Sequence, residues 1–177
     1  MLEANRAILG REFPDILERL DRRDAADVTV RSEPSKSGEP TLALLREGRT
    51  VYLHSQYNPR VEAERLMDDQ AALSGKKRVL FFGVGLGYHL ERYLQQHPDA
   101  RVAVYEPYPE ILRAWLSRVE LPEQVGRLFA GDREEEYERQ LGRFVGEQLD
   151  EFDVFILPAY ERLFPEAVAK FSSILKE

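Results

Sequence analysis

The chain has 177 residues and a net charge of -7, with 43% hydrophobic and 32% charged residues, which is the composition of an ordinary globular protein. No long cluster of lysine or arginine is present, so we expect no nucleic-acid partner. The absence of cysteine excludes disulfides and thiolate metal sites, and no apolar run approaches the roughly 18 residues of a membrane helix. We therefore expect a cytoplasmic protein that makes no membrane contact.

The N-terminal part is expected to combine helices with a small antiparallel sheet. Apolar residues recur at helical spacing from Met1 to Leu20, and Pro14 divides this segment into two helices. Three short β-like runs follow at 27–31, 41–45 and 50–54, and a glycine-containing tight turn separates the last two. We assign residues 1–57 to this helical segment and β-meander.

The second part, residues 58–177, begins with a helix that Asn58 caps, with Pro59 at its first position; we expect it to reach about Leu73. Strands are then predicted at 78–82, 101–105, 125–130 and 153–157, and helices at 88–96, 109–119, 134–149 and from 165 onward. Regular alternation with short connections predicts an α/β fold: a Rossmann-like, methyltransferase-like parallel sheet of at least four strands flanked by helices. Because methyltransferase-type sheets normally have seven strands, we expect the chain to belong to a longer protein.

The loop after the first parallel strand carries the most specific chemistry. Gly83, Gly85 and Gly87 form a Gly-x-Gly-x-Gly pattern, which is closer to the loop that binds S-adenosylmethionine (SAM) than to the dinucleotide pattern Gly-x-Gly-x-x-Gly. Tyr88 and His89 open the next helix, whose free amides can meet a carboxylate or phosphate. The alternative is a purely structural turn between strand and helix.

Acidic residues follow the next two strands, where they can contact a nucleotide-like ligand. Glu106 lies nineteen residues after Gly87 and is placed to accept hydrogen bonds from ribose hydroxyls, or else is a solvated acid in a turn. Asp132 can contact an adenine amine or cap the following helix. Phe81 departs from the methyltransferase pattern, which has an acidic residue two positions before the first glycine.

No catalytic residue and no metal site are predicted. His89 and His54 are more readily ordinary polar partners than ligands, and His97 does not cluster with them in the sequence. Tyr160 follows the fourth strand, where a ligand-facing role is an open alternative.

Four motifs together carry a family resemblance. They are Leu53-His54-Ser55-Gln56-Tyr57-Asn58-Pro59-Arg60-Val61-Glu62-Ala63-Glu64-Arg65, Phe82-Gly83-Val84-Gly85-Leu86-Gly87-Tyr88-His89-Leu90, Val104-Tyr105-Glu106-Pro107 and Leu157-Pro158-Ala159-Tyr160. Over residues 27–170 the chain resembles the N-terminal domain of the Maf (motility-associated factor) glycosyltransferases.

This resemblance implies a part in flagellin O-glycosylation with nonulosonic, sialic-acid-like sugars that are carried as CMP conjugates. It also implies that a different, central domain holds the transfer chemistry, so this chain is expected to be accessory and inactive alone. Its partners would be flagellin and the remaining domains, and the ligand candidates are a nucleotide, a CMP-sugar or SAM. A SAM-dependent methyltransferase-like domain and a flagellin-binding or scaffolding module remain the alternatives.

Overall fold

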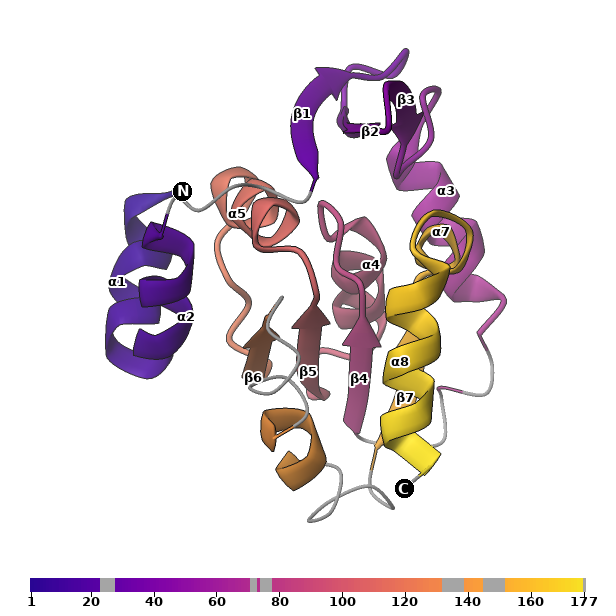
Figure 1. Ribbon diagram of the computed structural model, residues 1–177. Helices are drawn as coiled ribbons and strands as arrows, with labels where there is room; N and C mark the ends of the chain where they lie inside the picture. Colours follow the sequence, from indigo (N-terminus) through magenta and orange to yellow (C-terminus); the bar gives the residue numbers. More distant parts are fainter. Residues whose placement is uncertain (23–27, 71–72, 74–77, 132–138, 145–151, 177) are drawn as a thin grey trace.

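The computed structural model describes residues 1–22, 28–70, 73, 78–131, 139–144 and 152–176. Its centre is a four-stranded parallel sheet in the order β6-β5-β4-β7, shown in Figure 1. The strands are β4 (Arg78–Phe82), β5 (Arg101–Glu106), β6 (Val125–Ala130) and β7 (Asp153–Ile156). Since β4 pairs with both β5 and β7, the strand order reverses at β4. The predicted α/β fold is confirmed.

Helices cover both faces of this sheet because successive strand residues point to opposite sides. Phe81 packs its ring against His89 and Tyr93 of α4 (Tyr88–Gln96). Its neighbour Phe82 stacks at 4.4 Å between ring centroids on Phe171 of α8 (Pro165–Lys176). Helix α5 (Pro109–Arg118) joins β5 to β6, and α8 runs alongside β4 and β7 in Figure 1. The apolar residues of β4 are therefore buried on both faces.

The N-terminal helices are α1 (Glu3–Glu12) and α2 (Pro14–Asp21), and they break before Pro14 as predicted. They lie beside α5, on the side of the molecule opposite α8 (Figure 1). The fully buried Asn5 connects the two parts: its Nδ2 donates to the carbonyls of Leu116 and Val119, and its Oδ1 accepts from the amide of Leu121. The Asn5 side chain thus provides hydrogen-bond partners for the backbone groups at and just after the end of α5.

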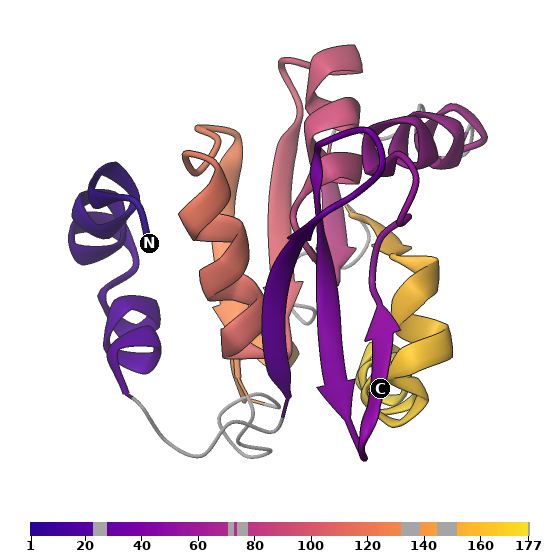
Figure 2. The same cartoon turned by 90° about the horizontal axis from the view of Figure 1, so that it is seen from above.

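The meander consists of β1 (Thr29–Pro34), β2 (Pro40–Arg46) and β3 (Arg49–Tyr52), antiparallel and in that order. It lies above the carboxyl ends of the parallel strands in Figure 1, and Figure 2 shows it from above. Strand β1 begins later than the predicted 27–31 and continues into the segment expected to be a loop. The register explains this, because Pro34 pairs with Pro40 directly across the hairpin.

Three further elements differ from the prediction. Helix α3 (Pro59–Asp68) has the predicted Asn58 cap but ends before Leu73, since the chain turns at Asp69. A short helix, α7 (Pro158–Leu163), was not predicted and starts with a proline at its first position, which favours helix initiation. Of the helix predicted at 134–149 the structure describes only 139–144, which is helical.

None of the described helices has the length and apolar character needed to cross a membrane. The division of the chain at residue 57 stays a prediction.

Candidate functional site

The glycine loop lies at the carboxyl end of β4, where the strand order reverses and open α/β sheets usually bind ligands. Gly83, Gly85 and Gly87 have φ angles of 85°, 53° and 84°. Residues with a Cβ adopt these values only with strain, so the three glycines are required by the backbone. The loop has the conformation expected of a ligand-binding turn, and its surroundings decide whether a ligand can reach it.

Every backbone amide from 83 to 87 donates a hydrogen bond inside the protein. The acceptors are Tyr105 O for Gly83 (2.8 Å), Glu106 Oε1 for Val84 (3.0 Å), Tyr160 OH for Gly85 (3.2 Å), His54 Nε2 for Leu86 (2.8 Å) and Val84 O for Gly87 (2.8 Å). Three of these acceptors are side chains that come from distant elements. The amides of residues 83–87 therefore already have partners in this chain.

Glu106 lies at the end of β5, directly beside the loop as predicted, and is completely buried. One carboxylate oxygen accepts from the amide of Val84 and the hydroxyl of Tyr160, and the other accepts from the amide of Tyr108 at 3.1 Å. Burial raises the pKa of Glu106 to about 7, although these hydrogen bonds oppose the rise. The hydroxyl that this acid binds belongs to Tyr160.

Tyr160 fills the space above the loop. It is fully buried on α7, and its hydroxyl lies between the Gly85 amide, from which it accepts, and Glu106, to which it donates. Its ring is so close to the backbone that a Cβ added to Gly83 would lie 2.7 Å from a ring carbon. Burial and the Glu106 carboxylate raise the pKa of Tyr160 well above its ordinary value. The side chain therefore faces the loop, in the place where a ligand would lie.

Two buried histidines complete the surroundings in opposite tautomers. His54 accepts from Leu86 through Nε2, which places its proton on Nδ1. Its ring covers Gly85, where an added Cβ would lie 2.5 Å from Nε2, and burial lowers its pKa to about 3. His89 bonds to the Gly83 carbonyl through Nε2 at 3.1 Å, so this nitrogen carries the proton, and burial lowers its pKa to about 4. Both rings are neutral at pH 7.

The opening of α4 is also engaged internally. The Tyr88 hydroxyl donates to the Pro40 carbonyl at 2.5 Å, which ties the loop helix to the meander. The guanidinium of Arg118 lies 4.0 Å above the Tyr88 ring and donates to the Leu86 carbonyl and to Glu91. Of the predicted site residues, the structure thus gathers Gly83, Gly85, Gly87, Tyr88, His89 and Glu106 around one loop, whereas Asp132 lies outside the described residues.

A family profile described as "Glycosyltransferase Maf N-terminal domain" matches residues 25–128, which is more than half of the chain. The chain belongs to this family. The matched segment includes the meander, α3, the glycine loop and Glu106, so the family profile covers most of the site described above. The resemblance stated from the sequence is confirmed at the level of the Maf N-terminal domain.

Two proteins that are similar to this Maf N-terminal domain are longer than the present chain. A protein of Treponema pallidum (strain Nichols), described as uncharacterized, is 36% identical over 112 residues, which are 58% of this chain and 36% of that protein. The solved structure of MAf glycosyltransferase from Magnetospirillum magneticum AMB-1 matches with a TM-score of 0.65 and 19% identity, over 98% of this chain and 34% of that one. This structural similarity supports the α/β fold assignment. The chain spans about a third of the length of each.

Sequence reasoning placed the loop and Glu106 correctly in space but missed how His54 and Tyr160 close over them. His54 was interpreted as an ordinary polar partner, and Tyr160 only as a residue that could face a ligand. A signal was present, because both residues belong to the motifs that carry the Maf resemblance. We call these two side chains, with Glu106, the plug of the Maf domain.

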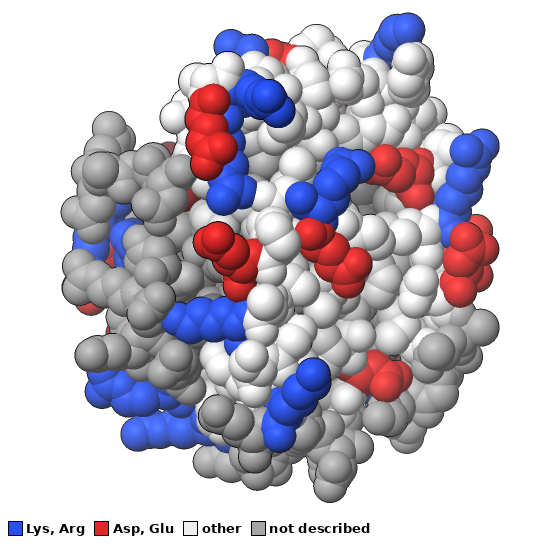
Figure 3. Space-filling model, turned by 45° about the vertical axis from the view of Figure 1, so that its right-hand side comes forward, with Lys and Arg blue, Asp and Glu red and all other residues white. Residues whose placement is uncertain are grey.

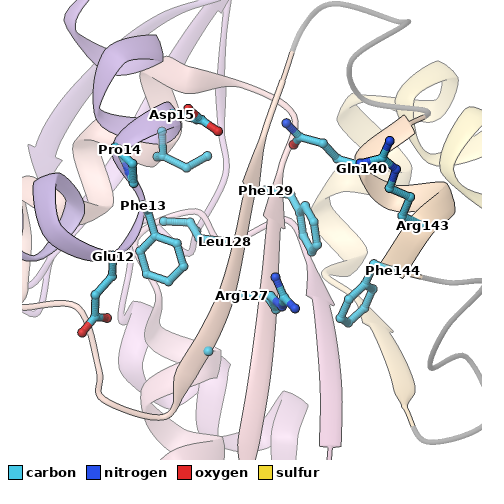
Figure 4. A pocket seen from close by; sticks show the side chains of 12 residues that line it. Glu12, Phe13, Pro14, Asp15, Arg127, Leu128, Phe129, Gln140, Arg143 and Phe144 are labelled. Carbon is cyan, nitrogen blue, oxygen red and sulfur yellow. The ribbon is translucent and has the colours of Figure 1, made fainter.

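Among the residues that the structure describes, two of the hollows lie outside the plug. One, of about 420 Å³, lies between the α1–α2 corner and β6; Figure 4 shows Phe13 beside Leu128, and Phe129 and Phe144 on the other side of the strand. The other, of about 780 Å³, lies between α3 and the β7–α7 corner. Neither is lined by a residue of the glycine loop.

Proposed function

We propose that this chain is an accessory, non-catalytic domain of a Maf glycosyltransferase that attaches nonulosonic sugars to flagellin in the cytoplasm. We propose further that its Rossmann-like crevice is closed by its own plug. The family membership supports the first statement, and one observation carries the second: every amide of the glycine loop has an acceptor within the chain. Flagellin and the remaining domains of the transferase are the partners that this proposal implies.

The chemistry of sugar transfer supports an accessory role. Transfer from a CMP-sugar needs donors for the departing phosphate and a base that reaches the acceptor hydroxyl. The loop donors are occupied, and Glu106, whose pKa of about 7 would suit a base, has no solvent-exposed surface. A buried carboxylate under a tyrosine ring cannot touch a substrate in this conformation.

The same contacts weigh against a SAM site, which is the alternative reading of the loop. SAM would need the Glu106 carboxylate for its ribose and the space that the Tyr160 and His54 rings occupy. Its entry would break the hydrogen bonds of Gly85 to Tyr160, of Tyr160 to Glu106 and of Leu86 to His54. Each of these bonds is buried, so breaking it costs about 1–3 kcal/mol unless the ligand replaces it.

Titration of the chain with SAM and, separately, with CMP tests the closed crevice. We expect neither ligand to give a calorimetric signal or to shift the amide resonances of residues 83–87 at concentrations of about 1 mM. The Glu106→Ala variant is the matched control and should also give no signal. Micromolar SAM binding that Glu106→Ala abolishes would overturn the proposal in favour of a methyltransferase-like domain.

A transfer assay tests the accessory role. With flagellin and a CMP-activated nonulosonic acid, we expect no glycosylation by the isolated chain. In a full-length polypeptide that carries this domain, Tyr160→Phe should keep transfer within a few fold of the unmodified enzyme, because the loop would not touch the sugar donor. Robust transfer by the isolated chain, or a hundredfold loss of kcat in the folded Tyr160→Phe enzyme, would contradict this role.

A further inference from the structure

The larger hollow forms an open groove along α3, which we call the α3 groove. Its residues come from the segment between β3 and α3, from one face of α3 and from the β7–α7 corner. They are Leu53, Ser55, Tyr57, Asn58, Val61, Glu62, Arg65, Leu66, Asp69, Leu157, Pro158, Ala159 and Arg162. The groove therefore includes half of the Asn-Pro-x-x-Glu-Ala-Glu-Arg segment, for which the plugged loop gives no explanation.

The shape of the groove suits a chain-like ligand. Asn58, Glu62, Arg65 and Asp69 recur every three or four residues, so they follow one face of the helix. Eleven residues of helical rise correspond to about 17 Å. This length accommodates about five residues of an extended peptide, each of which advances about 3.3 Å. A compact ligand would leave much of such an open groove unfilled.

Tyr57 gives the rim an exposed aromatic side chain on a backbone that hydrogen bonds hold at both its amide and its carbonyl. Its exposed fraction is 66%, the largest among the exposed large hydrophobic residues of the described chain. Its amide donates to Ser55 Oγ at 3.0 Å, and its carbonyl accepts from the amide of Ser37 at 2.9 Å. Rigid exposed aromatics lose little conformational entropy when they bind, so they are common anchors in protein interfaces.

The charges at the groove favour an acidic partner. Arg65 has no ion pair with any residue that the structure describes, and Lys36 lies 4.5 Å from the centroid of the Tyr57 ring. On the opposite wall, Arg162 donates to the Tyr52 carbonyl at 3.5 Å, which is a weak contact. Of the two acidic residues in the groove lining, Glu62 already accepts from the Ser55 amide at 3.0 Å.

This balance differs from that of the chain as a whole, which carries a net charge of -7. The groove lining carries two arginines, Arg65 and Arg162, and two acidic residues, Glu62 and Asp69, while Lys36 adds a positive charge beside the Tyr57 ring at the rim. Figure 3 turns the right-hand side of Figure 1 forward, where α3 and α7 lie; basic and acidic side chains alternate there among uncharged atoms. Recognition would therefore depend on individual guanidinium groups and not on a broad basic field.

We propose that the α3 groove binds an extended acidic peptide segment of about five residues that carries one apolar side chain. The apolar side chain packs against Leu53, Leu66 and Leu157 on the groove wall, and a carboxylate pairs with Arg65 or Arg162. The peptide passes beside the Tyr57 ring. None of these residues belongs to the plug. The peptide binding is therefore independent of whether the plug closes the crevice, and it does not require the proposed transferase role.

Three fluorescein-labelled eight-residue peptides provide the probes, each with one central leucine flanked by glutamates, serines or lysines. Fluorescence anisotropy with the whole chain should show the glutamate peptide binding at least about tenfold more tightly than the lysine peptide. The serine peptide should lie between them. The preference should shrink as salt is raised from about 0.05 to 0.5 M, since exposed charge pairs are screened.

Variants locate the binding in the groove. The double variant Arg65→Ala/Arg162→Ala should remove the preference for glutamate, and Tyr57→Ala should weaken all three peptides by about fivefold or more. Arg49→Ala and Arg101→Ala remove exposed arginines outside the groove and should change nothing, apart from a small general loss of charge attraction. Circular dichroism checks that each variant is folded.

The proposal is overturned if the glutamate peptide binds no better than the serine and lysine peptides, or if no peptide binds more tightly than about 1 mM. It is also overturned if the folded Arg65→Ala/Arg162→Ala protein keeps the full preference for glutamate. If Arg49→Ala lost the preference for the glutamate peptide, that preference would come from the electrostatic field of the whole chain. This result would equally contradict a site specific to the groove.

Discussion

Gly87 and Gly48 have similar left-handed backbones, with φ angles of 84° and 74°, but different surroundings. A Cβ on Gly87 would lie 2.4 Å from Nε1 of Trp115, whereas a Cβ on Gly48 would meet nothing within 4 Å. We expect Gly48→Ala to cost about 1–2 kcal/mol from backbone strain alone. Gly87→Ala adds overpacking of about 1–3 kcal/mol to the same strain. Urea unfolding of the two variants measures the difference, and equal losses would show that Trp115 moves aside freely.

Glu106 gives the plug a pH dependence of known sign. Its folded pKa of about 7 lies above the ordinary 4.5, so the folded protein keeps a proton that the unfolded chain releases. The stability that this proton contributes is fully present below pH 4.5 and is lost as the pH rises through about 7. The loss amounts to roughly 3 kcal/mol at most.

We therefore expect the free energy of unfolding of the wild type, measured relative to Glu106→Gln, to fall between about pH 4.5 and 7 and to level off above. His54 and His89 act in the opposite direction: their folded pKa values of about 3 and 4 lie below 6.5, so their contribution is lost as the pH falls. Both proteins keep these histidines, so the difference removes their effect. A difference that does not vary with pH would contradict the raised pKa.

At this scale the sequence predicted the positions of single residues better than their partners. The spacing of the glycines and the position of Glu106 follow from local strand and turn patterns, which a sequence displays directly. The acceptors for Leu86 and Gly85 lie 32 and 75 residues away in the chain. Local periodicity carries no information about such distant contacts, so His54 and Tyr160 could be recognised as a plug only in three dimensions.

At the scale of elements, one buried amide holds the N-terminal helices against the sheet domain. Asn5 satisfies the carbonyls of Leu116 and Val119 and the amide of Leu121, at 2.6 to 2.7 Å. Its replacement would leave the Val119 carbonyl and the Leu121 amide without this partner, whereas the Leu116 carbonyl would keep the Leu2 amide as a donor. The docking of α1 on α5 therefore depends on a polar contact as well as on the burial of Leu9.

We expect Asn5→Ala to lower the free energy of unfolding by about 2–4 kcal/mol and to speed amide hydrogen exchange in α1 and α2. Arg6→Ala is the matched control on the next residue. It removes an exposed ion pair with Asp21, which should contribute less than about 1 kcal/mol. Equal effects of the two substitutions would mean that Asn5 does not hold the helices in place.

Most elements were predictable because their apolar periodicity is strong. β4, α4 and β6 have the predicted bounds, and the break before Pro14 follows from the chemistry of proline. Two elements were harder to predict for a physical reason. β1 extends through the polar residues Arg31 to Pro34 because its pairing with β2 holds it, and α7 has only six residues, too few to show a helical stripe.

At the scale of the whole molecule, the helices, the meander and the sheet share one hydrophobic cluster. Leu9 of α1, Leu42 of β2 and Phe81 of β4 all belong to it. The plug crosses the predicted boundary at residue 57 as well, since His54 on one side accepts from Leu86 on the other. A cut at residue 57 would divide this cluster and remove the acceptor of the Leu86 amide.

We therefore expect the chain to unfold in one cooperative transition. The fluorescence of Trp115, which is buried against Gly87, and the far-UV circular dichroism of the whole chain should give the same urea midpoint. A truncated chain of residues 58–177 lacks His54 and the meander, so its Leu86 amide and the apolar wall above the loop lose their partners. We expect this truncated chain to show no cooperative transition. Two separated transitions in the whole chain, or a sharp transition in 58–177, would mean that the sheet domain folds independently of the segment that plugs it.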